Sequence, residues 1–208
     1  MTKIKICGIT TSKEIEILNK YLPDYVGFVF TSFRRQVTPE QAACLAEGLC
    51  ANINKVGVFV NSDLGYVAAA ADMAGLDVLQ LHGDEDPGYI KQLRSMVRPG
   101  TEIWKAFRVG PGHMPDKSHI SSFGADKILF DTFSAGSHGG TGKCFDWSLV
   151  SGLDHGLPIV LAGGLSAGNV REAIAVLSPY AVDTSSGVEK NGEKSEQLVS
   201  EFINAARI

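Results

Sequence analysis

The sequence of 208 residues has no long apolar run and nothing at its N-terminus that resembles a secretion signal. Its purest apolar stretch, from Pro158 to Leu165, is far shorter than the roughly 20 residues that a membrane-spanning helix needs. Lys3 and Lys5 interrupt the apolar residues that a signal peptide would group together. We therefore expect no membrane partner and a location in the cytoplasm.

Basic residues are also few and scattered. The chain has 19 Lys and Arg residues against 23 Asp and Glu residues, which gives a net charge of −4, and no basic run exceeds the pair Arg34-Arg35. Because proteins that bind nucleic acids usually carry a basic patch, we expect no nucleic-acid partner. A small anionic ligand stays compatible with this charge, since helix N-termini and local cations can bind an anion.

Cysteines are sparse, and none stands in a metal-binding arrangement. They are Cys7, Cys44, Cys50 and Cys144. The chain has no C-x-x-C motif and only five scattered histidines, so we expect no metal and reduced thiols. The segment Gly136–Lys143 resembles a P-loop, but Ser137 and Cys144 stand where that motif has Gly and Ser or Thr. No cofactor is therefore expected.

Eight short apolar segments alternate with segments that carry helix signals. The predicted strands are Lys3–Cys7, Tyr25–Phe30, Lys55–Val60, Asp77–Leu81, Glu102–Val109, Lys127–Asp131, Pro158–Ala162 and Tyr180–Thr184. Most are apolar on consecutive residues, which is typical of parallel strands that are buried on both faces. Thr11 with Glu14, and Thr38 with Gln41, fit capping boxes at the starts of two helices.

This alternation predicts a parallel sheet with right-handed crossovers. Eight units of about 26 residues each leave room for a strand, a helix and two short loops. Eight units favour a closed (β/α)8 TIM barrel, near the lower limit of that fold's length. The alternative is an open doubly wound sheet. No linker divides the chain, so we expect one domain over residues 1–208.

In a barrel of this kind, functional groups gather at the carboxyl ends of the strands. The residues at or just after these ends include a thiol, two carboxylates, a histidine and an arginine. They are Cys7, Arg35, His82, Asp131, Gly163, Gly164, Asp183, Ser185, Ser186 and Gly187. If the barrel closes, these residues surround its mouth.

The last two strand ends predict a phosphate site. Gly163 and Gly164 precede a helix that we expect to begin near Ser166, and the segment Ser185–Gly187 offers hydroxyls and closely spaced backbone N–H groups. The loops after strands 7 and 8 of this fold often hold phosphate through such groups. The alternative is that these glycines serve only as turn residues.

Cys7 and Asp131 end strands that lie well apart around an eight-membered ring. A ligand in the mouth would touch one on each side, and a base and an acid that flank a phosphosugar suit proton transfer within it. The alternatives are a small buried cysteine and an aspartate that caps a turn. The glycine-rich segment that follows, Gly136 to Gly142, is expected either to close over a bound substrate or to be a disordered surface loop.

A series of motifs extends through nearly the whole chain. They are Lys5–Thr10, Val26–Phe30, Arg35 before Thr38–Glu40, Val56–Asn61, Leu79–Gly83, Leu129–Thr132, Gly139–Lys143, Phe145–Trp147, Leu161–Leu165, Asn169–Val170 and Val182–Glu189. In their residues and their order these motifs resemble the phosphoribosylanthranilate isomerase family. One departure is Gln36, which stands where that family commonly has an aromatic residue.

The resemblance implies a cofactor-free barrel, monomeric or homodimeric, that acts in tryptophan biosynthesis. Its phosphosugar substrate would be N-(5′-phosphoribosyl)anthranilate, which undergoes an Amadori rearrangement to 1-(2-carboxyphenylamino)-1-deoxyribulose 5-phosphate. The resemblance makes Asp131 the general acid that opens the furanose ring and Cys7 the general base at C2′. It pairs Arg35 with the anthranilate carboxylate.

The same resemblance places Gly164, Ser185, Ser186 and Gly187 around the phosphate, next to Gly163. The roles of Asp183 and His82 follow from the barrel instead. Strand 8 neighbours strand 1 in a closed ring, so Asp183 would approach Cys7 or a sugar hydroxyl, and His82 would bond to the backbone and hold the mouth of the barrel in shape. The alternative for each is a purely structural role.

Two alternatives stay open from the sequence. The first is another phosphosugar barrel, such as the related histidine-pathway isomerase or an epimerase. The histidine-pathway enzyme uses a pair of aspartates, however, whereas strand 1 here ends in Cys7. The second is a non-catalytic phosphosugar-binding barrel, which would keep the phosphate loops without needing Cys7 and Asp131.

Overall fold

The computed structural model describes residues 1–110, 115–132, 147, 150–151 and 156–207. Eight parallel strands form a closed barrel in chain order, and β8 pairs back onto β1. The strands are β1 (Lys3–Cys7), β2 (Tyr25–Val29), β3 (Asn54–Phe59), β4 (Val78–Leu81), β5 (Glu102–Val109), β6 (Lys127–Thr132), β7 (Ile159–Leu161) and β8 (Ala181–Thr184). The predicted barrel is therefore confirmed, and the open sheet is excluded.

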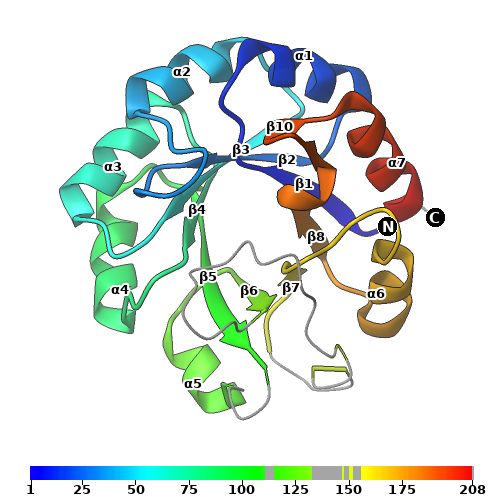
Figure 1. Ribbon diagram of the computed structural model, residues 1–208. Coiled ribbons are helices and arrows are strands. Elements are labelled where there is room, and N and C mark those ends of the chain that lie inside the picture. The colour runs from blue at the N-terminus through cyan, green and yellow to red at the C-terminus, as the bar shows by residue number, and fades with distance from the viewer. Residues whose placement is uncertain (111–114, 133–146, 148–149, 152–155, 208) are drawn as a thin grey trace.

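Helices surround the ring of strands on its outside (Figure 1). They are α1 (Ser12–Tyr21), α2 (Pro39–Glu47), α3 (Leu64–Met73), α4 (Pro87–Met96), α5 (Lys117–Ser122), α6 (Val170–Leu177) and α7 (Glu196–Ala206). Both predicted capping boxes are present, one between Thr11 and Glu14 and one between Thr38 and Gln41. Each box satisfies two backbone N–H groups that would otherwise lack partners. In the described part of the chain, no helix has the length and apolar character needed to cross a membrane.

Both faces of each strand are buried because the barrel has a filled interior and a helical coat. On β1, Ile4 and Ile6 belong to the outer core that the helices cover, whereas Lys5 and Cys7 lie inside the barrel. This two-sided burial explains the unbroken apolar runs in the sequence. The inner apolar cluster consists of Tyr25, Val56, Val78, Trp104, Ala106, Leu129, Val160, Ala162 and Ala181.

The structure corrects the predicted start of one helix. Helix α6 begins at Val170 rather than near Ser166. The side chain of Asn169 folds the preceding residues into a turn, since its Oδ1 accepts from the Ser166 backbone N–H at 2.8 Å and its Nδ2 donates to the Gly164 carbonyl at 3.1 Å. The glycine-rich segment between residues 136 and 142 lies outside the described residues.

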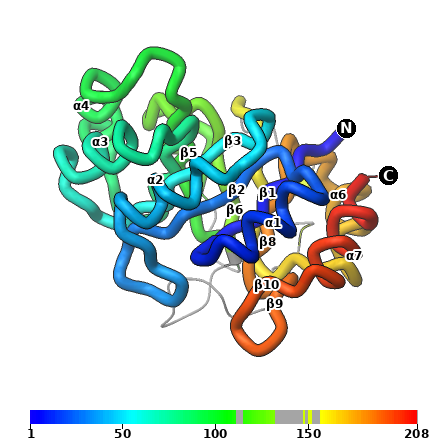
Figure 2. Tube along the Cα trace, turned by 90° about the horizontal axis from the view of Figure 1, so that it is seen from above, coloured from blue at the N-terminus to red at the C-terminus, as the bar shows by residue number. Residues whose placement is uncertain are grey.

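A short hairpin after β8 was not predicted. It comprises β9 (Glu189–Lys190) and β10 (Glu193–Lys194), which follow a single 3-10 turn, η2 (Ser186–Val188). Asn191 and Gly192 connect the two strands with φ values of 55° and 83°, as expected for an Asn-Gly turn. The hairpin and the loop after β2 project from the same end of the barrel (Figure 2).

Two buried charges connect the ends of β3 and β4 to the middle of β5. The carboxylate of Glu85 accepts from the backbone N–H groups of Asn61 at 2.8 Å and Gly83 at 3.0 Å, and from Lys105 Nζ at 2.8 Å. Lys105 also donates to the Gly83 carbonyl at 2.7 Å. The side chains of Glu85 and Lys105 are only 1% and 4% exposed, so this cluster fixes the ends of β3 and β4 relative to β5.

Replacement of Glu85 by alanine should destabilise the barrel strongly. It leaves the Lys105 ammonium buried without a countercharge, and the loss of one partner of a buried pair costs about 3–5 kcal/mol. Urea unfolding measures the change. The matched control is Glu196→Ala, which breaks an exposed pair with Lys20 and should leave stability almost unchanged. Similar small losses in both variants would contradict the assigned role of Glu85.

Candidate active site

A cavity of about 640 Å³ opens at the carboxyl ends of the strands. Every site residue that the sequence predicted lies in its lining. These are Cys7, Arg35, His82, Asp131, Gly163, Gly164, Asp183, Ser185, Ser186 and Gly187. A smaller cavity of about 320 Å³ elsewhere, between Asp77 and Arg98, contains none of them. The closed barrel therefore brings residues from both ends of the chain into one site.

Cys7 ends β1 with its thiol inside the barrel, and the residue is 9% exposed. Strand β2 comes so close that a Cβ at Gly27 would lie 2.6 Å from the Cys7 sulfur, so that position needs a glycine. Burial raises the pKa of the Cys7 thiol, and the neighbouring Lys5 and Lys194 lower it only in part. The close approach of Gly27 limits the positions that the thiol can occupy on the cavity wall.

Lys5 and Asp183 form a buried ion pair next to Cys7. Lys5 Nζ lies 2.7 Å from Asp183 Oδ2, and the two side chains are 0% and 8% exposed. The two residues are cross-strand partners in the β1–β8 register. Burial raises the pKa of Asp183, an effect that the Lys5 charge offsets only in part. Asp183 Oδ1 has no hydrogen-bond partner within the described chain, so it can accept from a ligand hydroxyl in the cavity.

Asp131 stands one residue before the end of β6 and is held by a chain of side-chain contacts. His82 Nε2 lies 3.1 Å from Asp131 Oδ2, and His82 Nδ1 lies 2.9 Å from Gln80 Nε2. The ring of His82 is thus positioned by side chains on both of its nitrogens. Gln80, which the sequence analysis did not select, is 2% exposed and also lines the cavity. A polar residue within the apolar run of β4 was the signal that could have identified it.

The loops after β7 and β8 form one wall of the cavity. Thr184 Oγ1 donates to the Leu165 carbonyl at 2.7 Å, and a Cβ at Gly187 would collide with the same oxygen. Gly163 and Gly164 have φ values of 89° and 68°, which glycine adopts without strain. The glycines therefore bring the two loops into close contact beside the cavity.

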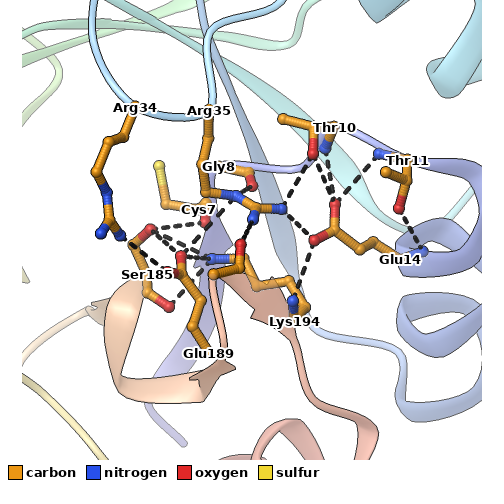
Figure 3. A network of polar contacts seen from close by, with 11 residues as sticks. Cys7, Gly8, Thr10, Thr11, Glu14, Arg34, Arg35, Ser185, Glu189 and Lys194 are labelled. Atoms are coloured by element: carbon orange, nitrogen blue, oxygen red, sulfur yellow. Dashed lines mark hydrogen bonds and ion pairs between the residues drawn. The ribbon is translucent and has the colours of Figure 1, made fainter.

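Arg35 lies at the rim of the cavity in a left-handed backbone conformation, with φ of 65°. Its guanidinium contacts the Glu14 carboxylate, two backbone carbonyls and, at 3.1 Å, Thr10 Oγ1 (Figure 3). Burial raises the pKa of Glu14, but backbone N–H donors and Arg35 outweigh it, so the net shift is downward. Arg34 beside it is 65% exposed and pairs with Glu189 at 2.9 Å.

The β9–β10 hairpin connects this rim to the loop after β8. Lys194 Nζ donates to the Ser185 carbonyl at 3.0 Å, to its hydroxyl at 3.2 Å and to Glu189 Oε1 at 2.8 Å. Ser185 Oγ in turn donates to the Cys7 carbonyl at 3.0 Å (Figure 3). Burial lowers the pKa of Lys194, while Glu189 raises it in part. Glu14, Glu189 and Lys194 support the site but were not selected from the sequence.

The fold and the cavity together define a (β/α)8-barrel enzyme with acid–base groups at the carboxyl ends of its strands. Within the described residues, no group of three or more His, Cys, Asp or Glu side chains is placed to hold a metal ion.

Comparison with known proteins identifies the family. The family model described as N-(5′-phosphoribosyl)anthranilate (PRA) isomerase matches residues 4–205. The N-(5′-phosphoribosyl)anthranilate isomerase of Clostridium acetobutylicum is 44% identical, over 100% of this chain and 98% of that protein. The enzyme of Thermoanaerobacter pseudethanolicus is 42% identical over the same shares. The chain belongs to the PRA isomerase family.

Solved structures agree with this assignment. The phosphoribosylanthranilate isomerase of Thermotoga maritima superimposes with a TM-score of 0.88 at 34% identity, over 100% of this chain and 99% of that one. A second isomerase structure has a TM-score of 0.82 at 32% identity, over the same shares. That protein was solved in complex with reduced 1-(o-carboxyphenylamino)-1-deoxyribulose 5-phosphate.

The close approach of β2 to Cys7 predicts the effect of Gly27→Ala. The added Cβ would lie 2.6 Å from the sulfur and 3.1 Å from the Cys7 Cα, so the thiol or the strand must move. We expect a lower unfolding temperature together with a loss of activity. Gly168→Ala is the control, because its Cβ would meet only Ser166 Oγ at 3.8 Å. Unchanged stability and activity in Gly27→Ala would refute the tight fit.

Proposed function

We propose that the chain isomerises N-(5′-phosphoribosyl)anthranilate to 1-(2-carboxyphenylamino)-1-deoxyribulose 5-phosphate, with Cys7 as general base and Asp131 as general acid. This reaction is a step of tryptophan biosynthesis. The observation that carries the assignment of roles is that Cys7 and Asp131, from β1 and β6, line the same cavity. Membership of the PRA isomerase family supports the choice of substrate.

The first step opens the sugar ring. Asp131 donates its proton to the furanose ring oxygen, the bond from C1′ to that oxygen breaks, and the nitrogen lone pair forms a C1′=N⁺ Schiff base. The cationic nitrogen acidifies the hydrogen on C2′, so a base of modest strength can remove it. The Asp131 carboxylate that remains lies within reach of His82 Nε2.

The second step moves a proton from carbon to sulfur. The Cys7 thiolate takes the C2′ hydrogen, and the C–H electron pair forms a C1′=C2′ enolamine while the nitrogen becomes neutral. The enolamine then tautomerises, with C1′ gaining a proton and the 2′ hydroxyl losing one, to give the ketone. Substrate and product are isomers, so no electrons enter or leave.

The proposed mechanism needs Cys7 as a thiolate, whereas the burial of Cys7 favours the protonated thiol. Burial raises the pKa of the thiol, so the free protein holds Cys7 mainly protonated at neutral pH. The cationic nitrogen of the Schiff base is bonded to C1′, the neighbour of C2′. Its positive charge stabilises a thiolate that lies next to C2′. The base is therefore formed most readily when the opened substrate is in place.

The remaining cavity residues fit the parts of the substrate. In the proposal, Arg35 binds the anthranilate carboxylate from the rim, and the free oxygen of Asp183 accepts from a ribose hydroxyl. His82 orients Asp131. The phosphate lies against the glycine-rich wall. The residues of that wall are Gly163, Gly164, Ser185, Ser186 and Gly187.

The proposal extends to the setting of the enzyme. The whole chain would work as one domain in the cytoplasm, without a metal or other cofactor and without nucleic-acid or membrane partners. It would be a monomer or a homodimer. The isomerase of Thermotoga maritima, which is described as dimeric and from which monomers have been generated, offers both precedents.

Replacement of Cys7 or Asp131 by alanine tests the assigned chemistry. Each variant should lower kcat by about 10²- to 10⁴-fold, the usual contribution of a general acid or base, while the circular dichroism spectrum stays unchanged. The loss of phosphoribosylanthranilate fluorescence measures turnover. Cys44→Ala, which changes an exposed cysteine, is the matched control and should retain full activity. Near-normal turnover in Cys7→Ala or Asp131→Ala would remove that residue from the mechanism.

The phosphate wall predicts a separate effect on substrate binding. Ser186→Asp places a negative charge beside the expected phosphate, so KM should rise roughly tenfold or more through repulsion of like charges. The value of kcat should change much less, because Ser186 does not reach the reacting carbons in the proposal. Ser95→Asp on the exposed end of α4 is the control. An unchanged KM in Ser186→Asp would place the phosphate elsewhere.

A further inference from the structure

Lys5 is a cation in an unusual place. Its side chain is fully buried, at 0% exposure, inside a barrel whose interior also holds an apolar cluster. Burial of an ammonium group is costly even when it has a partner. The proton transfers described above make no use of Lys5, so its presence inside the barrel needs a separate explanation.

The neighbours of Lys5 suggest what it does. On β1 it stands two residues before Cys7, so both side chains point into the barrel. Its ammonium pairs with Asp183 Oδ2 at 2.7 Å, and its charge lowers the pKa of the Cys7 thiol on the same face of the strand. Lys5 thus lies between an anion on β8 and the group that must become an anion during the reaction.

The other charges around Cys7 are few within the described chain. Asp183 on β8 disfavours the thiolate, and Lys194 on β10 favours it. Strand β2 offers only Gly27 at this point. Asp131 and His82, on the far side, act on Asp183. On β1 itself, Lys5 is the cation nearest to Cys7 in the sequence, two residues before it.

We propose that Lys5 is a positioning residue, fixed by Asp183, whose ammonium stabilises the thiolate form of Cys7. The proposal rests on the proposed function only in giving Cys7 the part of the base. It requires Lys5 to stay charged. Burial lowers the pKa of Lys5, but Asp183 and Cys7 raise it further, and the net shift is upward, so the ammonium persists at neutral pH.

Neutralising Lys5 and neutralising Asp183 should shift the pKa of the Cys7 thiol in opposite directions, which makes the proposal testable. Loss of the Lys5 charge should make the Cys7 thiolate harder to form, because burial and Asp183 are then opposed only by Lys194. Loss of the Asp183 charge should make the thiolate easier to form, since a neighbouring anion is removed. A merely structural ion pair would not move the ionisation of Cys7 in opposite directions when one partner or the other is neutralised.

The experiment measures alkylation of Cys7 by iodoacetamide as a function of pH, in protein whose other cysteines are replaced (Cys44→Ser, Cys50→Ser and Cys144→Ser). In this background, Lys5→Met should raise the midpoint of the alkylation curve by about one pH unit or more. Asp183→Asn should lower it. Lys5→Arg keeps a cation and should return the midpoint most of the way to its original value.

Lys5→Met leaves Asp183 buried without a countercharge, so it is compared with the double variant Lys5→Met/Asp183→Asn, which removes both charges. The double variant should fold and should have a midpoint below that of Lys5→Met. If Lys5→Met does not fold, the lowered midpoint of Asp183→Asn and the double variant still decide the question. A midpoint unmoved by Lys5→Met, or raised by Asp183→Asn, overturns the proposal.

Alkylation needs no substrate, so the two proposals fail separately. If the alkylation midpoint shifts as expected while the pH profile of kcat/KM does not follow it, Cys7 is not the base, although Lys5 still controls its ionisation. If Cys7→Ala is inactive and the midpoint ignores Lys5, the base assignment stands and the role of Lys5 is wrong.

Discussion

The pairing of β8 with β1 is the interaction on which the site depends. It closes the barrel and sets Lys5 opposite Asp183 in register. Because side chains alternate along a strand, the same register places Cys7 above that pair on the cavity wall. It also brings Ser185, one residue beyond β8, within hydrogen-bond distance of the Cys7 carbonyl. A shift of β1 by one residue in this register would turn Lys5 and Cys7 out of the barrel and away from Asp183.

Around this pairing, the barrel uses buried charge to hold loops that are otherwise irregular. Glu14 connects the start of α1 to Arg35 and to the backbone of β10. Glu85 connects the ends of β3 and β4 to Lys105 on β5. Each carboxylate accepts backbone N–H groups as well as a cation, which offsets its desolvation. These contacts restrain the walls of the cavity, which Cys7, Asp131 and the glycines after β7 and β8 line.

The sequence revealed the features that depend on local pattern. Apolar runs located all eight strands, and capping boxes placed the starts of α1 and α2. The residues predicted at the strand ends, from Cys7 to Gly187, all line the cavity, because a closed barrel brings those ends together. Features that depend on long-range contact were missed. Lys5 and Gln80 could be recognised only from their contacts with Asp183 on β8 and with His82. Helix α6 begins later than predicted because the Asn169 side chain accepts from the Ser166 backbone N–H, a contact that sequence periodicity does not indicate.

The central claim is that one ribose lies between the Cys7 thiol and the Asp131 carboxyl. A crystal structure of this protein with reduced 1-(2-carboxyphenylamino)-1-deoxyribulose 5-phosphate tests it most directly. The account predicts the phosphate against Gly164 and Gly187, the Cys7 sulfur next to C2′, and the Asp131 carboxyl near the sugar oxygen released from the ring. A ligand that binds with C2′ out of reach of the sulfur, or with Asp131 facing away from the sugar, would contradict the account.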